Sequence, residues 1–342
     1  MAAPESYAIK IGQRILVTGA NSFVGSNVID VLLSLGYTVR GTVRSERPWL
    51  NELFDNKYGA GKFETVVVPS LDDKKRLLDV LAGISGVIHV ASDVSFDSDA
   101  GKLVPYVVNA TETVMQAASE IASVKRVVLT SSSVAAVIPE AGHGRLELTQ
   151  DTWNDASIAA AWDPNTPAEI KGLMVYAASK TAGERAAFDW VKKHKPGYVL
   201  NSVLPDYTIG EVLHPNIGSS GVLTALLLEG NDTIIKIILS QYFVDAKDLA
   251  RLHVIALLNQ TVTSERLFGL AGRFEWKDVI DNLRELRPSS KKLVTDFPPA
   301  RTGNVEIVPT ERSKELLRSF FGQEEWTSLK DSLDSCISSL DM

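Results

Sequence analysis

Short apolar segments alternate with amphipathic ones between residues 14 and 205, and this alternation is the strongest constraint on the fold. The apolar segments are rich in β-branched residues and nearly continuous, which is typical of strands covered on both faces of a sheet. We expect strands at 14–19, 37–44, 63–68, 86–92, 125–133 and 198–205. We expect helices at 23–36, 72–84 and 111–122, and one starting near Tyr176. This order predicts βαβ units, and so an α/β fold of the Rossmann type with a doubly wound parallel sheet.

The pattern changes after Pro205. The later segments are a loop at 210–221, a strongly apolar stretch at 222–239, a strand and helix over 242–258, and amphipathic helices at 276–286 and 324–340. No internal repeat or low-complexity linker separates them. The simplest division is a Rossmann domain over residues 1–205, to which residues 242–262 return, and a smaller C-terminal α/β lobe over residues 206–342.

The composition excludes several classes of function. The chain has 342 residues, is 45% hydrophobic and carries a net charge of −7, which disfavours nucleic acid as a partner. The single cysteine, Cys336, leaves no internal disulfide framework, and the five histidines show no metal-like spacing. We expect His89 and His253 to be structural. No segment has the pattern of a secretory signal or a membrane span. The sequence therefore predicts a soluble, cytoplasmic protein, monomeric or homodimeric, without a metal or membrane partner.

A glycine-containing turn, "VTGANSFVGS", joins the first expected strand to the first helix. Glycines at this point allow a tight turn, and they let backbone N–H groups approach a pyrophosphate at the helix N-terminus. Gly19 and Gly25 occupy two of the expected positions, and Ser22 occupies the middle one. The alternative is a purely structural turn, but its place in the first βαβ unit favours a dinucleotide site.

The end of the second strand indicates which dinucleotide would bind. A site for NAD has a carboxylate there for the ribose 2′-hydroxyl, whereas an arginine accepts the 2′-phosphate of NADP. Here Val43 stands where the acid is expected, and Arg44 and Arg47 follow. These arginines are either a solvated loop or a phosphate site. The absence of an acid favours NADPH.

Tyr176 and Lys180 stand four residues apart in "VYAASKTAGE", so one helix face carries both. An ammonium about 4 Å from a phenol favours the phenolate by around 4 kcal/mol at an effective dielectric of about 20, or about three pKa units. We expect Lys180 to lower the pKa of Tyr176 in this way and make it an efficient acid. At the end of the fifth strand, Ser132 or Ser133 could hold a substrate oxygen, or merely satisfy backbone groups.

Together these motifs resemble the extended short-chain dehydrogenase/reductases, especially the dihydroflavonol-reductase-like branch with its yeast and fungal aldehyde and ketone reductases. The resemblance spans nearly the whole chain and rests on "VTGANSFVGS", "VRGTVRS", "HVAS", "LTSSSVAAV", "VYAASKTAGE", "VLPDYTIG" and "FVDAKDLARLHVIAL". It implies a catalytic triad of Ser132, Tyr176 and Lys180. It implies contacts with NADPH from Tyr176, Lys180, Gly19, Asn21, Ser22, Phe23, Val24, Gly25, Arg44, Ser70, Leu71, Ala91, Ser92, Pro205, Asp206, Tyr207, Thr208 and Ser220.

Three positions depart from the family pattern. Ser22 stands where glycine is usual, Ser70 where aspartate is usual, and Asp206 where asparagine is frequent. The last adds a negative charge close to the expected nicotinamide pocket.

The expected substrate is a hydrophobic or aromatic ketone or aldehyde. Its pocket would be lined by mostly apolar residues: Val94, Phe96, Val137, Ile138, Tyr207, Val222, Leu226 and Gln241. For each of these residues the alternative is core packing. Three other functions share the fold: a sugar-nucleotide epimerase or dehydratase, a non-catalytic NADP sensor, and a cinnamoyl-CoA reductase. The absence of an acid near Val43 argues against the epimerase or dehydratase. The intact Tyr176 and Lys180 argue against the sensor. The flank "LMVYAASK" argues against the cinnamoyl-CoA reductase.

Overall fold

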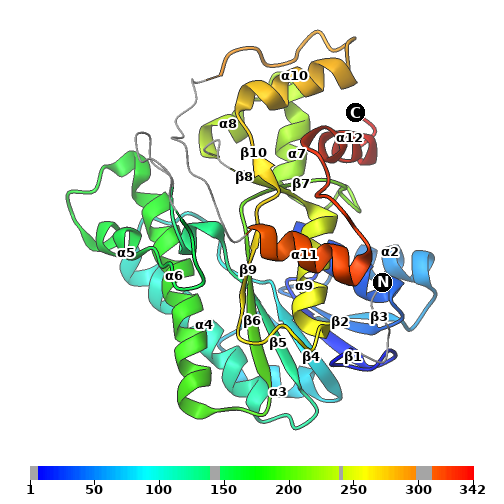
Figure 1. Ribbon diagram of the computed structural model, residues 1–342, viewed down its shortest axis with the longest axis vertical. Coiled ribbons are helices and arrows are strands. Elements are labelled where there is room, and N and C mark those ends of the chain that lie inside the picture. The colour runs from blue at the N-terminus through cyan, green and yellow to red at the C-terminus, as the bar shows by residue number, and fades with distance from the viewer. Residues whose placement is uncertain (1–6, 139–146, 239–241, 298–309) are drawn as a thin grey trace.

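A seven-stranded parallel sheet forms the centre of the molecule (Figure 1). The computed structural model describes residues 7–138, 147–238, 242–297 and 310–342. The sheet has the order β3-β2-β1-β4-β5-β6-β9. Its strands are β1 (Arg14–Thr18), β2 (Thr38–Val43), β3 (Phe63–Val67), β4 (Ile84–His89), β5 (Arg126–Thr130), β6 (Val199–Pro205) and β9 (Arg266–Gly269). The predicted α/β class and doubly wound parallel sheet are confirmed.

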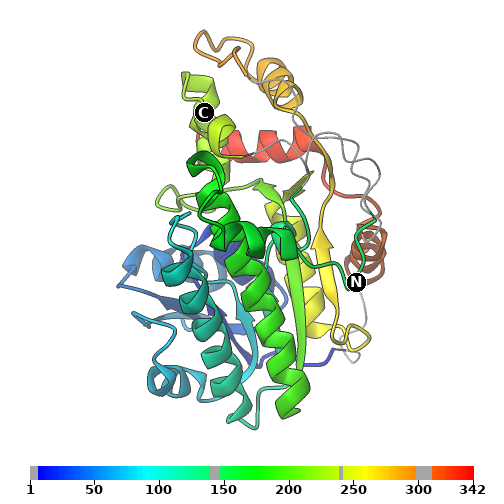
Figure 2. The same cartoon turned by 90° about the vertical axis from the view of Figure 1, so that its left-hand side faces the viewer.

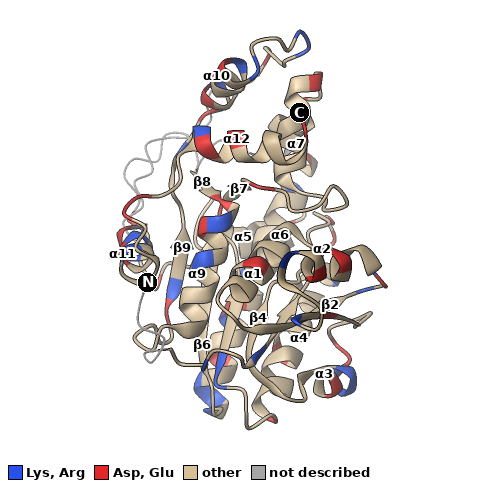
Figure 3. Ribbon diagram, turned by 90° about the vertical axis from the view of Figure 1, so that its right-hand side faces the viewer, with Lys and Arg blue, Asp and Glu red and all other residues tan. Residues whose placement is uncertain are grey.

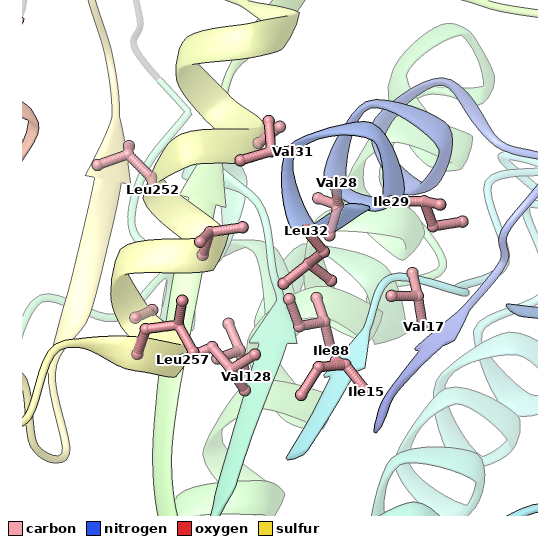
Figure 4. Close-up of a cluster of buried hydrophobic side chains, with 14 of the residues drawn as sticks. Ile15, Val17, Val28, Ile29, Val31, Leu32, Ile88, Val128, Leu252 and Leu257 are labelled. Carbon is pink, nitrogen blue, oxygen red and sulfur yellow. The ribbon is translucent and has the colours of Figure 1, made fainter. Parts of the chain in front are cut away.

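Helices cover both faces of this sheet because successive strand residues point to opposite sides. Ile15 and Val17 pack in one buried cluster with α1 and α9, whereas Leu16 packs in another with α3 and α4. Figure 4 shows the first cluster, which includes Val28 and Leu32 of α1, Leu257 of α9, and Ile15 and Val128 of the sheet. The helices of that face are α1 (Phe23–Ser34), α2 (Pro48–Tyr58), α9 (Ala246–Leu258) and α11 (Thr310–Phe321).

Two long helices lie side by side on the opposite face (Figure 2). These are α4 (Ala100–Ser119) and α6 (Ala168–His194), flanked by α3 (Lys74–Leu81) and α5 (Asp155–Trp162). The helices α4 and α6 begin earlier than the sequence predicted. We expected α4 to start at residue 111 and α6 to start near Tyr176. Pro105 interrupts the helical pattern in the sequence, yet α4 continues through it. Asp99 caps the α4 N-terminus by accepting from the Lys102 N–H. Pro167 directly precedes α6.

The C-terminal part of the chain builds a smaller lobe around its own core. A three-stranded sheet of order β10-β8-β7 stands against helices, with Tyr207, Phe243 and Trp276 in the buried cluster. Charged residues of both signs are mixed along the outer side of α10 (Figure 3), where Arg284 pairs with Asp281 at 2.6 Å. The elements are β7 (Tyr207–Ile209), α7 (Ser220–Ala225), the 3₁₀ turn η3 (Leu226–Glu229), α8 (Thr233–Ile237), β8 (Tyr242–Asp245), β10 (Gly272–Arg273), α10 (Trp276–Leu286) and α12 (Leu329–Ser339).

The chain passes between the two sheets more than once. β8 belongs to the small sheet, α9 packs on the main one, and β9 pairs with β6. We propose that the lobe binds the substrate and the main sheet the dinucleotide. Within the described residues, no helix is both long enough and apolar enough to cross a bilayer.

Candidate active site

A cavity of about 660 Å³ runs across the carboxyl ends of the parallel strands and on into the C-terminal lobe. Its wall includes the segments that follow β1, β2, β4, β5 and β6, and parts of α4, α6 and α8. This is where an open α/β sheet places its ligands. Of the residues expected to contact the dinucleotide, the wall contains Gly19, Asn21, Ser22, Phe23, Val24, Arg44, Leu71, Ala91, Ser92, Tyr176, Lys180, Pro205, Asp206, Tyr207, Thr208 and Ser220.

The glycine turn is a closely packed corner. Gly19 has a φ of +67°, and a Cβ there would lie 3.1 Å from the backbone of Ala91. A Cβ on Gly25 would lie 2.3 Å from the Gly19 carbonyl oxygen. Gly25 is absent from the cavity wall, and its expected contact with the dinucleotide stays a prediction. The turn needs both glycines because neither position has room for a side chain.

Ser22 explains how the turn works without a middle glycine. Its hydroxyl donates to the Gly19 carbonyl at 2.7 Å and accepts from the Gly25 N–H at 3.1 Å. It is therefore the N-cap of α1. The Ser22 hydroxyl thus hydrogen-bonds to the backbone of both glycines, and the turn still borders the cavity.

The far end of the cavity lies beside β2 and β3. Arg44 is exposed there and makes no ion pair with any described residue, while the Arg47 guanidinium donates to the Glu46 carbonyl at 2.9 Å. The expected contact from Ser70 stays a prediction: its hydroxyl is hydrogen-bonded to Asp72, and the residue lies outside the cavity wall. Leu71 faces the cavity instead. Arg44 is thus placed to meet an anionic group at this end.

The three expected catalytic residues meet at the opposite end. Tyr176 and Lys180 lie one turn apart on α6, and Ser132 follows β5 where the 3₁₀ turn η2 (Ser133–Ala135) begins. The Lys180 Nζ is 6.0 Å from the centre of the Tyr176 ring and 3.4 Å from the Thr130 carbonyl oxygen. All three side chains border the same cavity.

The expectation that Lys180 lowers the pKa of Tyr176 is wrong for this structure. Burial raises the pKa of Tyr176, hydrogen bonding to the Ser132 hydroxyl lowers it, and the charge of Asp206 raises it further. Burial also lowers the pKa of Lys180 to about 8, against an opposing effect of Glu184. The phenol therefore stays protonated at neutral pH, in the form that can donate a proton.

Two buried histidines support this end of the cavity. The His89 Nδ1 is 2.8 Å from the Thr18 hydroxyl, and the His253 Nε2 is 2.8 Å from the Thr130 hydroxyl. Burial lowers the pKa of both imidazoles to about 4, so both are neutral at pH 7. Both are structural as expected, although His89 also borders the cavity. No group of metal-ligating side chains occurs within the described ranges.

Comparison with known proteins identifies the family. A model of the NAD dependent epimerase/dehydratase family matches residues 15–268. The chain belongs to this family. It is 42% identical to ketoreductase adrE of Penicillium rubens, over 98% of this chain and 99% of that protein. It is 37% identical to aldehyde reductase 2 of Sporidiobolus salmonicolor, over 99% of both. Gre2 of Candida albicans in complex with NADPH has a TM-score of 0.77, at 25% identity over 96% of this chain and 98% of that one.

In this member of the epimerase/dehydratase family, the substrate side of the cavity has an aromatic edge. The Phe96 ring lies 4.7 Å from the Tyr176 ring, and Phe96 has an unusual φ of +55°. A Cβ on Gly172 would lie 2.5 Å from the Phe96 carbonyl oxygen, so this loop touches α6 where glycine makes room. Val94, Phe96, Ile138 and Tyr207 border the cavity as expected.

Three other residues expected to line the substrate pocket are not in the cavity wall, and their contact with substrate stays a prediction. Val137 packs on the cluster of Ala135 and Leu204, and Val222 packs on the lobe core. Leu226 begins η3 and is outside the cavity wall. Their neighbours Ile138 and Leu223 face the cavity, because the side chains of adjacent residues point in different directions. Gln241 lies outside the described residues.

Several wall residues were missed by the sequence analysis. They come from α4, α6, α8 and the residue that follows α8: Val107, Ala110, Thr111, Leu173, Ile234 and Ile238. The signal for the α4 residues is their spacing of three and four, which places them on one helix side. That spacing is also typical of core packing, and only the neighbouring strand ends show that this side borders a cavity.

Proposed function

We propose that this protein is an NADPH-dependent carbonyl reductase, which converts a ketone or aldehyde with hydrophobic or aromatic substituents into a chiral alcohol. The observation that carries the proposal is the continuity of one cavity from the glycine turn and Arg44 to Ser132, Tyr176 and Lys180. One end of this cavity would take the dinucleotide, and the other end, beside the phenol, would take a small carbonyl compound. The named ketoreductase and aldehyde reductase relatives support the same reaction class.

The residues would hold NADPH in the following way. The turn from Gly19 to Val24 would take the pyrophosphate at the α1 N-terminus, and Arg44 the 2′-phosphate. Lys180 would bind the ribose hydroxyls close to Tyr176. When bound, NADPH supplies the hydride.

The chain's own residues handle the carbonyl oxygen. The Ser132 hydroxyl donates a hydrogen bond to this oxygen, which becomes more negative as the carbonyl is reduced. The Tyr176 phenol then gives its proton to the alkoxide. The apolar wall around Phe96 and Ile138 excludes water and favours hydrophobic substituents.

An epimerase or dehydratase acting on a sugar nucleotide is the competing function. The carboxylate expected at position 43 is replaced by Val43. This replacement, the adjacent Arg44 and the apolar Ile234 of α8 disfavour it. We also propose that the enzyme works in the cytoplasm as a monomer or homodimer.

The test is the initial rate of NADPH and NADH oxidation with β-keto esters, aryl ketones and aldehydes, for wild type and Tyr176→Phe. We expect turnover with NADPH well above that with NADH, and its loss in the variant. Equal use of both cofactors would contradict the role of Arg44. NADPH binding without oxidation by any carbonyl would contradict the reductase.

A further inference from the structure

The Asp206 carboxyl borders the same cavity as the Tyr176 phenol, and its charge acts on that phenol. Asp206 joins β6 to β7, and its Oδ1 accepts from the Tyr207 N–H at 2.8 Å. The Tyr242 N–H donates to the same carboxyl group. The Ser133 hydroxyl also faces it, although it is buried without a well-formed hydrogen bond to any described residue. The carboxyl is therefore held in place by backbone donors from two strands.

The environment of Asp206 makes its charge variable near neutral pH. Burial raises its pKa to about 7, while its N–H and hydroxyl donors lower it. Of the charged described residues, Asp206 is the one whose charge acts on the pKa of Tyr176, which it raises. The other titratable side chains in the wall are Arg44, His89, Asp93, Tyr106, Lys180 and Tyr207. Asp93, the other wall carboxylate, accepts from the Ser95 N–H at 2.8 Å.

We propose that Asp206 is a positioning residue whose carboxylate sets the charge of the cavity for carbonyl reduction. It keeps the proton on the Tyr176 oxygen, and it favours the oxidised nicotinamide, which is positively charged, over the neutral reduced form. This proposal rests on the proposed function. In the reduction, NADPH would supply a hydride, which is one hydrogen nucleus with two electrons, to the carbonyl carbon. One proton would pass from Tyr176 to the oxygen, and the phenolate would then take up a proton from solvent. The nicotinamide ring thereby gains a positive charge near the carboxylate.

The short distances between the reacting groups explain why the charge of Asp206 matters. The carbonyl oxygen must touch Tyr176 to receive its proton, and the hydride donor must be about 3–3.5 Å from the adjacent carbon. The positive charge therefore develops in the same part of the cavity as the phenol. A single negative charge there stabilises it in a medium of low effective dielectric.

The experiment compares the dissociation constants of NADP⁺ and NADPH for wild type and Asp206→Asn at pH about 5.5 and about 7.5. We expect the affinity for NADP⁺ relative to NADPH to rise about ten-fold with pH in wild type, and to stay constant in the variant. The 2′-phosphate titrates in this range but is common to both nucleotides, so it cancels in the ratio. Lys180, whose pKa is about 8, begins to lose its proton at the upper pH, and Asp206→Asn separates that change from the titration of Asp206.

Three variants serve as controls. Asp72→Asn removes one negative charge outside the wall, and it should leave the ratio unchanged. Asp206→Glu should restore the pH dependence. Ser133→Ala removes a hydroxyl that lowers the pKa of Asp206, so the midpoint of the transition should move to higher pH. This last variant carries the test if Asp206→Asn does not fold.

Two outcomes would overturn the inference: equal changes in the affinities for NADP⁺ and NADPH in Asp206→Asn, or a wild-type ratio that does not depend on pH. The binding ratio needs no carbonyl substrate. Turnover with a constant ratio would therefore contradict the role of Asp206 alone. A pH-dependent ratio without turnover would contradict the reductase alone.

Discussion

Ser132 shows how one hydroxyl contributes to the site at the residue scale. It follows the end of β5, and its hydrogen bond to Tyr176 lowers the pKa of that phenol by stabilising the phenolate. We predict that Ser132→Ala lowers kcat for carbonyl reduction by about 10²–10³-fold, as for the loss of one donor to a developing oxyanion. Steady-state rates would measure this. Ser123→Ala is the control, because its hydroxyl donates to the Ile84 carbonyl at the other end of the sheet. An equal loss in both variants would contradict a specific role.

Asp206 also makes stability depend on pH. Its pKa is about 7 in the folded protein and 3.8 ordinarily, so between these values the folded state binds the proton more tightly than the unfolded state does. The contribution of Asp206 to stability therefore falls as the pH rises from about 4 to about 7. We predict that the Tm of Asp206→Asn, relative to wild type, is higher at pH 8 than at pH 5. Thermal unfolding at both pH values measures it, and a constant difference would contradict the raised pKa of this carboxyl group.

At the scale of elements, one buried ion pair ties α6 to the sheet. Glu184, two turns after Tyr176, contacts Arg266 of β9 at 2.9 Å and accepts from the Ser131 and Ser202 hydroxyls. The arginine also stacks on Trp153 at 3.9 Å. The carboxylate thus joins the catalytic helix to β5, β6 and β9.

We predict that Glu184→Gln lowers the free energy of unfolding by about 3–5 kcal/mol, because Arg266 is left as an uncompensated buried charge. Urea denaturation measures it. The double variant with Arg266→Met should be less destabilised than the single one, since it buries no unpaired charge. Asp281→Asn, in an exposed pair on α10, should remain close to wild type. A small effect of Glu184→Gln would mean that water reaches the pair.

The glycine turn gives a second prediction at this scale. Gly25→Ala places a Cβ against the Gly19 carbonyl, so the turn between β1 and α1 must open. We predict that the dissociation constant for NADPH rises at least about ten-fold. Titration of protein fluorescence measures it. Gly197→Ala is the matched control, because a Cβ there meets nothing within 4 Å.

At the scale of the whole molecule, the cavity joins the main sheet to the C-terminal lobe. A ligand that binds the folded state alone stabilises it by about 2.7 kcal/mol at a hundred times its dissociation constant. We predict that NADPH raises the Tm of the wild type more than NADH does at equal concentration, and that Arg44→Ala removes this difference. Arg47→Ala should retain it, because the Arg47 guanidinium is bonded to the Glu46 carbonyl. Differential scanning fluorimetry measures all three proteins.

The order of the elements was predictable because it depends on local patterns. Runs of β-branched residues predicted six of the seven strands of the main sheet to within two or three residues, and the family follows from motifs at their ends. The misses have local causes too. β9 has four residues, too few for a periodic pattern, and Pro105 interrupts the pattern of α4. The helix α11 begins directly after residues 298–309, which the structure does not describe.

The sequence by itself determined the fold class, the family and the position of Ser132, Tyr176 and Lys180 at one end of the sheet, because parallel strands bring their carboxyl ends together. Only the tertiary structure decided which neighbour faces the cavity, Ile138 or Val137, since a shift of one residue reverses a side chain. It alone decided the direction of the Tyr176 pKa. That value depends on burial and on the charge of Asp206, thirty residues away in the chain, and neither is encoded in the spacing of Tyr176 and Lys180.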